Sequence, residues 1–594
     1  MNSAEPLSRE AETLSSLSSF FHWLERTVGL FGFTELALAA LFVLLAITVP
    51  HWGSRQYGRI EAFFAPLAKS ARLQILAVGL LAILARAAML PWLGTPSPAV
   101  HDEQSLLLQA QTYMAGRLAN PMHPFWEHFE SFHINQVPAY ASMYFPGRGA
   151  PLAAGLFLAD NPWVGVWLSF VLMAMAAVWM LQGWVSLPMA LLGGVLVVVR
   201  FGVFSYWINS YWGGAFTALG GMLVIGALPR ILQQPRWRHG ALMGLGMLIL
   251  MTTRPYEGAL LCLPVAALLL ARLFRPAAKG QRLEFVRIAA PAAVFVGAGI
   301  ALLLAYNAAT TGHMAKTPYD LNRQTYAIAP AFLFAPPVKS ELRGPAYFRD
   351  FYKAEATSYE RRGATKEKIR AAVAKVAHSW NFYLGATFTI AFLAGLWAAR
   401  RQYFLAATIG IFYAGYLLET WNFPHYTAPL FSVLLILMMR GFEWLRTFEW
   451  RQKPVGLFLT RAMPTAAVAI LLLPAVSLWV GKPLTEDNVQ SKACCVLTDG
   501  NLRTKLVHQL QEIPGRDLVL VKEGKNNPIH FELVYNNADI DRSEIVWAHH
   551  LSPERALALR HYFADRRVWE FEWEGDTVPG YRLTLLTPPV EPRH

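Results

Sequence analysis

LQILAVGLLAILARAAMLPWL, residues 73–93, is an apolar run with one charged residue, Arg86, and the polar sequence HDEQ follows it at 101–104. A helix needs about 20 apolar residues to cross a membrane. The run therefore predicts a membrane-spanning helix that ends shortly before two adjacent carboxylates, Asp102 and Glu103. What these carboxylates do depends on the side of the membrane that they face.

Further apolar runs extend this prediction to the whole chain. Of the 594 residues, 55% are hydrophobic and 15% are charged, against roughly 45–50% and about 25% in soluble proteins. Apolar windows lie at 31–49, 73–95, 160–182, 186–206, 213–232, 239–253, 258–274, 288–306, 379–398, 402–419, 426–440 and 461–481. They predict a multi-span α-helical membrane protein with about 11–13 spans.

Lysine and arginine assign sides to the predicted loops. Most of the net charge of +13 lies in short connections such as 51–72, 233–238 and 275–287, which alternate with connections almost free of these residues. Cytoplasmic loops carry such an excess. The alternation therefore predicts sidedness and argues against a nucleic-acid partner. It places Asp102 and the segment RPYEG at 254–258 on the same, outer side.

The predicted organisation has three parts: an N-terminal segment at 1–30, a transmembrane domain at 31–481 with outer loops at 96–159 and 307–378, and a soluble extracytoplasmic domain at 482–594. In the last part, stretches rich in valine and aromatic residues predict strands at 518–523, 544–551 and 568–574. Helical patterns lie between them, at 501–513 and 553–566. This alternation predicts a small α/β fold.

The first outer loop holds most of the candidate site residues, namely Asp102, Glu103, His128, Glu130, His133 and Arg148. Apolar residues at helical spacing after Glu103 predict a helix along the membrane surface. The two acidic residues could take part in a reaction or only cap this helix. The histidines and Glu130 could contact a substrate or form surface hydrogen bonds. Their spacing matches no zinc-binding helix, so no metal site is predicted, and a divalent cation is left open.

Residues of other outer segments are candidates for substrate or phosphate contacts, namely Arg254, Glu257, Lys316, Tyr319 and His425. The guanidinium of Arg254 could bind a phosphate at the membrane surface. Alternatively, it could pair with Glu257, three residues further along the same helix. Lys316 lies near the start of the loop 307–378, where it could reach a phosphate at the membrane surface.

Several motifs resemble polytopic glycosyltransferases of the C-type (GT-C) superfamily, which includes protein O-mannosyltransferases and lipid A aminoarabinose transferases. The resemblance is carried by HDEQSLLLQA at 101–110, GRLANPMHPFWEHFESFH at 116–133 and FPGRGAPLAAG at 145–155. NSYWGGAFTALGGMLVIGALPRI at 209–231 and VYNNADIDRSEIVWA at 534–548 are similar to sequences of a bacterial branch whose members mostly lack an assigned substrate.

The resemblance implies a membrane-embedded transferase that inverts configuration at the sugar. Its donor would be a hexose or pentose on a polyprenyl phosphate, and its acceptor a hydroxyl of a lipid, glycan or protein. Asp102 would be the general base and Glu103 would orient it or a water molecule, with Arg254 and Lys316 as phosphate partners. The protein would be a multi-pass protein of the bacterial cytoplasmic membrane with its site facing the periplasm or exterior.

Two other classes of function stay open at this point. A transporter or lipid-sugar flippase would place ionisable residues near the middle of the membrane, often in matching repeats. Here the candidate residues gather at one predicted surface and no repeat is apparent. A membrane-anchored binding protein, with residues 482–594 as its working part, is the third class.

Overall fold

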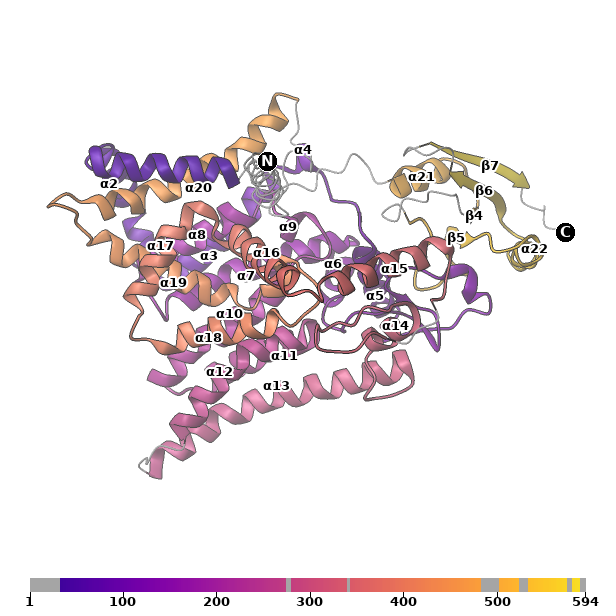
Figure 1. Cartoon of the computed structure of the whole chain (residues 1–594), viewed down its shortest axis with the longest axis horizontal. Helices are drawn as coiled ribbons and strands as arrows, with labels where there is room; N and C mark the ends of the chain where they lie inside the picture. The colour runs from indigo at the N-terminus through magenta and orange to yellow at the C-terminus, as the bar shows by residue number, and fades with distance from the viewer. Residues whose placement is uncertain are drawn as a thin grey trace, which may run out of the picture.

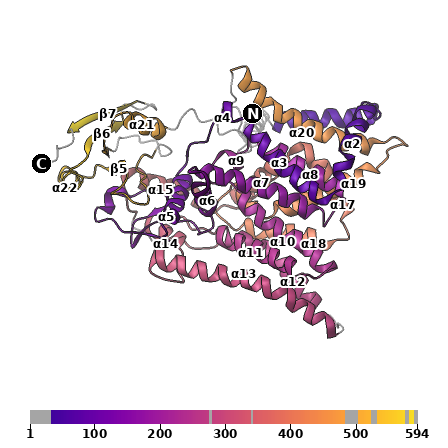
Figure 2. The same ribbon diagram turned by 180° about the vertical axis from the view of Figure 1, so that it is seen from behind.

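The computed structural model describes residues 32–273, 279–338, 342–481, 502–522, 532–573 and 580–587. The predicted N-terminal segment at 1–30 lies outside these residues. The chain forms a body of packed helices with a small region of strands and two helices at one end (Figures 1 and 2). The first outer loop and the helices α14 (Pro318–Tyr326) and α15 (Ala346–Arg361) lie between the two parts in both views.

The helical body begins with the helix Gly32–Thr48. It continues with α2 (Ser54–Ala68), α3 (Ala71–Ala87), α6 (Ala150–Ala159), α7 (Pro162–Leu181), α8 (Leu187–Phe201), α9 (Tyr206–Asn209), α10 (Ala215–Gln233), α11 (Trp237–Thr253), α12 (Pro255–Leu273) and α13 (Lys279–Thr311). Its last helices are α16 (Thr365–Tyr383), α17 (Gly385–Ala398), α18 (Tyr403–Tyr416), η2 (Pro424–Thr427), α19 (Phe431–Arg446) and α20 (Val455–Trp479).

Five helices of the described chain are long and apolar enough to cross a membrane, or up to seven if two bent pairs each count as one span. The bent pairs are α2 with α3, at 114°, and α16 with α17, at 96°. Several other predicted windows hold shorter apolar helices, such as Leu187–Phe201 and Tyr403–Tyr416. The chain is thus a multi-span integral membrane protein, and the count of 11–13 spans stays a prediction.

Small residues let the helices of the body approach closely. A side chain at Gly221 would bring its Cβ to 2.6 Å from the carbonyl oxygen of Pro429, and one at Gly246 to 2.7 Å from the carbonyl oxygen of Gly220. The small-residue run at 213–221 is therefore a packing surface of α10. It faces α11 and the segment that precedes α19.

The short helix α4 (Leu90–Leu93) precedes the first outer loop. The loop contains α5 (His101–Met114), η1 (Trp126–Phe129) and three short strands, β1 (Asn120–Pro121), β2 (Ile134–Asn135) and β3 (Ala139–Ser142). The strands form a sheet in the order β1-β3-β2. The helix predicted after Asp102 is confirmed as α5. The loop 307–378 contains α14 (Pro318–Tyr326) and α15 (Ala346–Arg361), and α16 begins within it.

The C-terminal region contains α21 (Leu502–Gln511), β4 (Asp517–Val521), β5 (Ile545–His549), α22 (Pro553–Tyr562), β6 (Arg567–Trp573) and β7 (Tyr581–Thr587). The strand order is β5-β4-β6-β7, with β4 parallel to both neighbours and β7 antiparallel to β6. The three predicted strands and two predicted helices are confirmed, and β7 is an additional edge strand. All five residues of β4 are buried, because both faces of the sheet are covered.

Candidate active site

The two adjacent carboxylates at the start of α5 have different surroundings. Glu103 is buried, and its carboxylate accepts three hydrogen bonds from backbone N–H groups. One oxygen accepts from Ala99 (2.6 Å) and Val100 (3.0 Å), and the other accepts from Tyr211 (2.7 Å). Burial raises the pKa of Glu103 to about 7, against the three backbone donors. Neighbouring side chains of a helix point about 100° apart, so Asp102 faces a different set of groups. Glu103 therefore anchors the start of α5.

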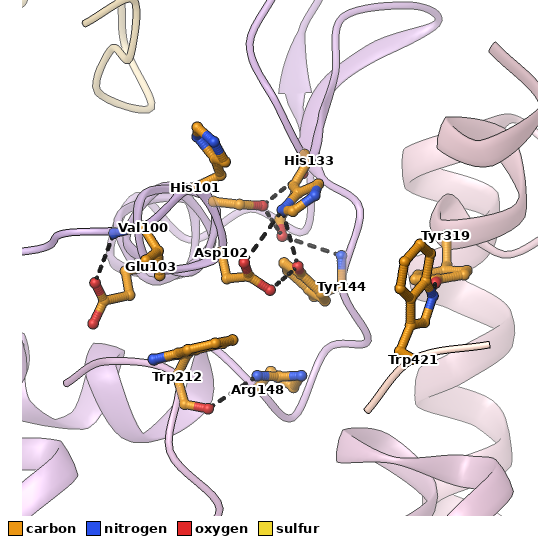
Figure 3. Close-up of polar contacts among 12 residues, drawn as sticks. Val100, His101, Asp102, Glu103, His133, Tyr144, Arg148, Trp212, Tyr319 and Trp421 are labelled. Atoms are coloured by element: carbon orange, nitrogen blue, oxygen red, sulfur yellow. Dashed lines mark hydrogen bonds and ion pairs between the residues drawn. The ribbon is translucent and has the colours of Figure 1, made fainter. Parts of the chain in front are cut away.

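Asp102 is fixed by two side chains of the same loop, His133 directly before β2 and Tyr144 shortly after β3 (Figure 3). The hydroxyl of Tyr144 donates a hydrogen bond to Oδ1 of Asp102, and Nδ1 of His133 lies 3.6 Å from Oδ2. Nδ1 of His133 is also 3.1 Å from the Tyr144 hydroxyl oxygen. Because that hydroxyl has a single proton, directed at Asp102, the histidine nitrogen is the donor in the second bond.

Neighbouring groups keep the Asp102 carboxylate ionised. Burial has the largest single effect and raises the pKa of Asp102. Charge interactions with His133, Arg148 and His101, together with the Tyr144 hydrogen bond, outweigh it, so the pKa lies below its ordinary value. Burial also lowers the pKa of His133. Near neutral pH the site thus holds a carboxylate that can accept a proton.

Hydrogen bonds of α5 hold the hairpin that carries His133 and Tyr144. The hydroxyl of Ser105 lies 2.7 Å from the carbonyl oxygen of His133 and 2.8 Å from the hydroxyl of Ser142. The backbone N–H of Met143 donates to the same carbonyl of His133 at 3.0 Å. His133 has a φ of 61°, a left-handed conformation that is uncommon for residues other than glycine. These contacts fix the direction in which its ring points, towards Asp102.

Arg148 lies beside this pair on the turn 145–149. The backbone N–H of Gly147 donates to the carbonyl of Thr252 at 2.8 Å, and a Cβ at Gly147 would lie 2.5 Å from the Thr252 hydroxyl, so only glycine fits there. The Arg148 guanidinium lies 4.8 Å from the centre of the Tyr144 ring and donates to the carbonyl of Trp212 at 3.3 Å. The structure thereby brings the first outer loop to the end of α11.

Arg254 directly follows α11, and its guanidinium, unlike that of Arg148, forms an ion pair with a described residue. Its guanidinium donates to Glu257 at 2.7 Å and lies 4.0 Å from the centre of the Tyr426 ring. The pairing of Arg254 with Glu257, one of the two sequence alternatives, is thus present. Burial lowers the pKa of Arg148, and the positive charge of Arg254 adds to the effect. Arg148 therefore lies near two charged groups, the carboxylate of Asp102 and the guanidinium of Arg254.

The remaining predicted residues make other contacts. The hydroxyl of Tyr319 accepts a hydrogen bond from the Trp421 indole at 3.2 Å, and Tyr319 packs against the buried cluster that contains Tyr144. Lys316 is half-buried, and its side chain has no ion pair or hydrogen bond with another described residue. His425 is buried between aromatic rings. The centre of its ring lies 4.9 Å from that of Trp212 and 5.1 Å from that of Tyr426.

His128 and Glu130 contact the C-terminal region instead of an open site. Nδ1 of His128 donates to the carbonyl of His549 at 2.7 Å, and Nε2 of His549 donates to the carbonyl of Glu130 at 2.8 Å. The carboxylate of Glu130 accepts from the Tyr326 hydroxyl at 3.0 Å. Both side chains are therefore buried in protein contacts, and substrate contact by these two residues stays a prediction.

The described part of the chain has no cluster of three or more histidine, cysteine or acidic residues with the geometry of a metal site. The sequence has one Asp-x-Asp pair, Asp539 and Asp541, in the C-terminal region. Asp541 lies 3.0 Å from Nε2 of His123, and Asp539 lies 3.5 Å from Arg542. These carboxylates thus pair with neighbouring cations and side chains.

Sequence reasoning missed Tyr144 and the contacts of His101. Tyr144 lies directly before the FPGRG turn at 145–149, but a tyrosine in an aromatic-rich loop carries no distinguishing signal. His101 precedes Asp102, and its Nδ1 lies 2.7 Å from the hydroxyl of Tyr535 in the C-terminal region. A contact between positions this far apart in sequence is set by the fold and leaves no local pattern.

No protein-family profile matches the sequence, and no curated protein does. Solved structures are similar in fold. An oligosaccharyltransferase from Archaeoglobus fulgidus, tethered with an acceptor peptide, is 8% identical, with 84% of this chain and 68% of that chain covered and a TM-score of 0.46. ArnT from Cupriavidus metallidurans, bound to undecaprenyl phosphate, is 12% identical, with 84% and 92% covered and a TM-score of 0.45.

At these identities and TM-scores the similarity assigns neither an activity nor a substrate to this chain. Function is therefore argued from the residues around Asp102.

Replacing Tyr144 by Phe should raise the pKa of Asp102, because one of the groups that lower it is lost. A general base works only when deprotonated. The decline of kcat/KM at low pH should therefore begin at a higher pH than in the wild type. We expect kcat/KM to be about tenfold lower at pH 5, where part of Asp102 is protonated, and about threefold lower at pH 7.5, where only the hydrogen bond is lost. Profiles of rate against pH for the purified protein would show this. Tyr403→Phe, at a residue that is 78% exposed on α18, is the matched control, and an unchanged profile in Tyr144→Phe would refute the argument.

Proposed function

We propose that the protein is an inverting glycosyltransferase that moves a hexosyl or pentosyl unit from a polyprenyl phosphate to an acceptor hydroxyl at the outer surface of the cytoplasmic membrane. The observation that carries the proposal is the ionised Asp102 carboxylate, held by Tyr144 and His133 beside the cation Arg148. It lies in the loop that follows an apolar helix. In this arrangement the carboxylate can take the proton of an acceptor hydroxyl, and the cation can stabilise a leaving phosphate.

The proposed reaction is a single displacement. Asp102 takes the proton of the acceptor hydroxyl while the acceptor oxygen bonds to the anomeric carbon of the sugar. The bond from that carbon to the phosphate oxygen breaks on the opposite face, and its electron pair leaves with the polyprenyl phosphate. Because Tyr144 occupies Oδ1 of Asp102, Oδ2 is the oxygen that accepts the proton.

Arg148 is the proposed partner of the leaving phosphate, which gains negative charge as the bond breaks. Arg254 adds positive charge near Arg148 and keeps its ion pair with Glu257. Glu103 is a positioning residue, since both of its oxygens already accept backbone N–H groups. Glu103 is therefore not proposed to orient a water molecule, and Lys316 as a phosphate partner stays a prediction.

The outer location follows from the distribution of lysine and arginine between loops, which favours the periplasm or exterior for Asp102. A donor whose lipid tail stays in the membrane and an acceptor that arrives from the aqueous side can meet at such a site. The sugar and the acceptor are not specified by the residues around Asp102.

Purified protein in vesicles, supplied with radiolabelled polyprenyl phosphate sugars and cell-envelope extracts, should transfer the label to an acceptor with inversion at the anomeric carbon. Product anomers can be distinguished by nuclear magnetic resonance. Movement of the labelled donor across the vesicle without any transfer would favour a flippase and refute the proposal.

A further inference from the structure

We infer that residues 532–541 of the C-terminal region, here named the strap, are a fixed part of the active site, and that Tyr535 is a positioning residue for Asp102 that acts through His101. The inference deepens the proposed function and its catalytic part rests on it. It makes the C-terminal region a component of the catalytic unit, although the sequence predicts a separate soluble domain. Three sets of contacts support it.

The first set is a hydrophobic core shared by the first outer loop and the C-terminal region. One cluster of buried residues contains Leu108 of α5, Phe129, Ile134 and Tyr140 from the loop, together with Leu518, Leu520, Tyr535, Ala538, Ile540, Val546, Ala548, Ala556, Leu559, Phe563 and Val568 from the C-terminal region. Burial of apolar surface is the main stabilising contribution in folding. Neither partner could separate without exposing this core to water.

The second set is the row of hydrogen bonds that holds the strap on both sides. On the side of the first outer loop, the Tyr140 hydroxyl donates to the carbonyl of Asn536 at 2.8 Å, and the Gln111 amide donates to Asn537 at 3.0 Å. On the other side, Arg503 of α21 donates to the carbonyl of Tyr535 at 2.8 Å. The strap is thus bonded to α5 and to its own region at the same time.

The third set connects the strap to the catalytic carboxylate. The Tyr535 hydroxyl shares a 2.7 Å hydrogen bond with Nδ1 of His101, the residue directly before Asp102. The His101 ring is buried, and its centre lies 4.4 Å from that of Phe132. His101 and Asp102 occupy the same first turn of α5, so a contact that holds the His101 ring helps to hold the backbone from which Asp102 projects (Figure 3).

A strap held in this way stays docked while the enzyme turns over. Its buried side chains include Leu533, Val534 and Tyr535, each at most 4% exposed. A lid that opened in each cycle would have to expose these residues and break the bonds to α5. The contacts therefore favour a permanent wall over a lid.

The contact between the strap and α5 can first be tested without an activity measurement. In a cysteine-free full-length protein, Gln111→Cys with Asn537→Cys should be joined within minutes by a short, reducible bifunctional thiol reagent, whereas each single variant should not form the cross-link. Failure of the pair to react in the native protein would overturn the docked strap. Transfer activity of the cross-linked protein should stay within about twofold of the reduced form. Loss of activity that returns on reduction would show a moving lid and overturn the inference.

The positioning role is tested by a double-mutant cycle. Tyr535→Phe should lower kcat about fivefold, the factor expected for one hydrogen bond, and leave the KM for the donor unchanged. In a His101→Ala background the same substitution should change kcat by less than twofold, because its effect passes through His101. Tyr581→Phe, on the edge strand β7, is the matched control. If the two effects multiplied in full, or if Tyr535→Phe behaved as the wild type, the positioning role would be refuted.

Failure of the proposed function would look different. If Asp102→Asn kept full transfer activity, the assignment of the base would fail while the cross-link between positions 111 and 537 still formed. If the cross-link failed while Asp102→Asn was inactive, only the inference about the strap would be lost.

Discussion

Replacing Asp102 by Asn is expected to lower kcat by about 10²–10⁴-fold, the usual contribution of a general base. The amide has nearly the same shape and can still accept the Tyr144 hydrogen bond with its oxygen. It cannot take a proton from the acceptor hydroxyl. The KM for the polyprenyl phosphate donor should change little, because Arg148 and Arg254 are unaltered. Steady-state transfer rates at several donor concentrations would separate the two parameters.

Asp160→Asn provides the matched control for this substitution. Asp160 is an exposed carboxylate that ends α6, with a φ of 51°, and asparagine tolerates this left-handed conformation. The control should transfer sugar at the wild-type rate. Equal activity of Asp102→Asn and Asp160→Asn, with both proteins folded, would remove Asp102 from the reaction.

The local structure around Asp102 could be predicted from sequence because it depends on short-range patterns. Apolar spacing after Glu103 indicated α5, and valine-rich stretches indicated β4, β5 and β6. The surroundings of the carboxylate could not be predicted in the same way. Tyr144 and His133 reach Asp102 through a hairpin whose register depends on Ser105 and on the left-handed conformation of His133. Such contacts join residues that are distant in sequence.

The boundary of the C-terminal region was hard to predict for a related reason. A change in composition near residue 482 indicated a separate soluble domain, and the strands were found where expected. The burial of every residue of β4 requires a cover on both faces of the sheet, but composition does not identify that cover. One cover is the first outer loop, through Leu108 and Phe129. His128 and Glu130 are buried at the same contact, which their polar side chains gave no reason to expect.

Replacing Arg148 by Met is expected to lower kcat by about 10²–10³-fold, the range found when one group that stabilises developing negative charge is removed. Methionine retains much of the apolar stem that lies against the Tyr144 ring. The decrease in kcat should therefore measure the contribution of the positive charge. Arg148→Lys should recover only part of the rate, because an ammonium group lacks the planar pair of donors that matches phosphate oxygens.

Arg349→Met, at an exposed arginine of α15, removes the same charge away from Asp102 and should leave the rate unchanged. The dependence on the leaving group gives a sharper test than the rate alone. A donor whose phosphate is a better leaving group needs less stabilisation of charge, so Arg148→Met should lose less activity with a sugar pyrophosphate than with a sugar phosphate on the same lipid. An equal loss with both donors would mean that Arg148 holds the fold of the 145–149 turn, and the leaving phosphate would then have to be assigned to Arg254, whose guanidinium would need to release Glu257 to reach it.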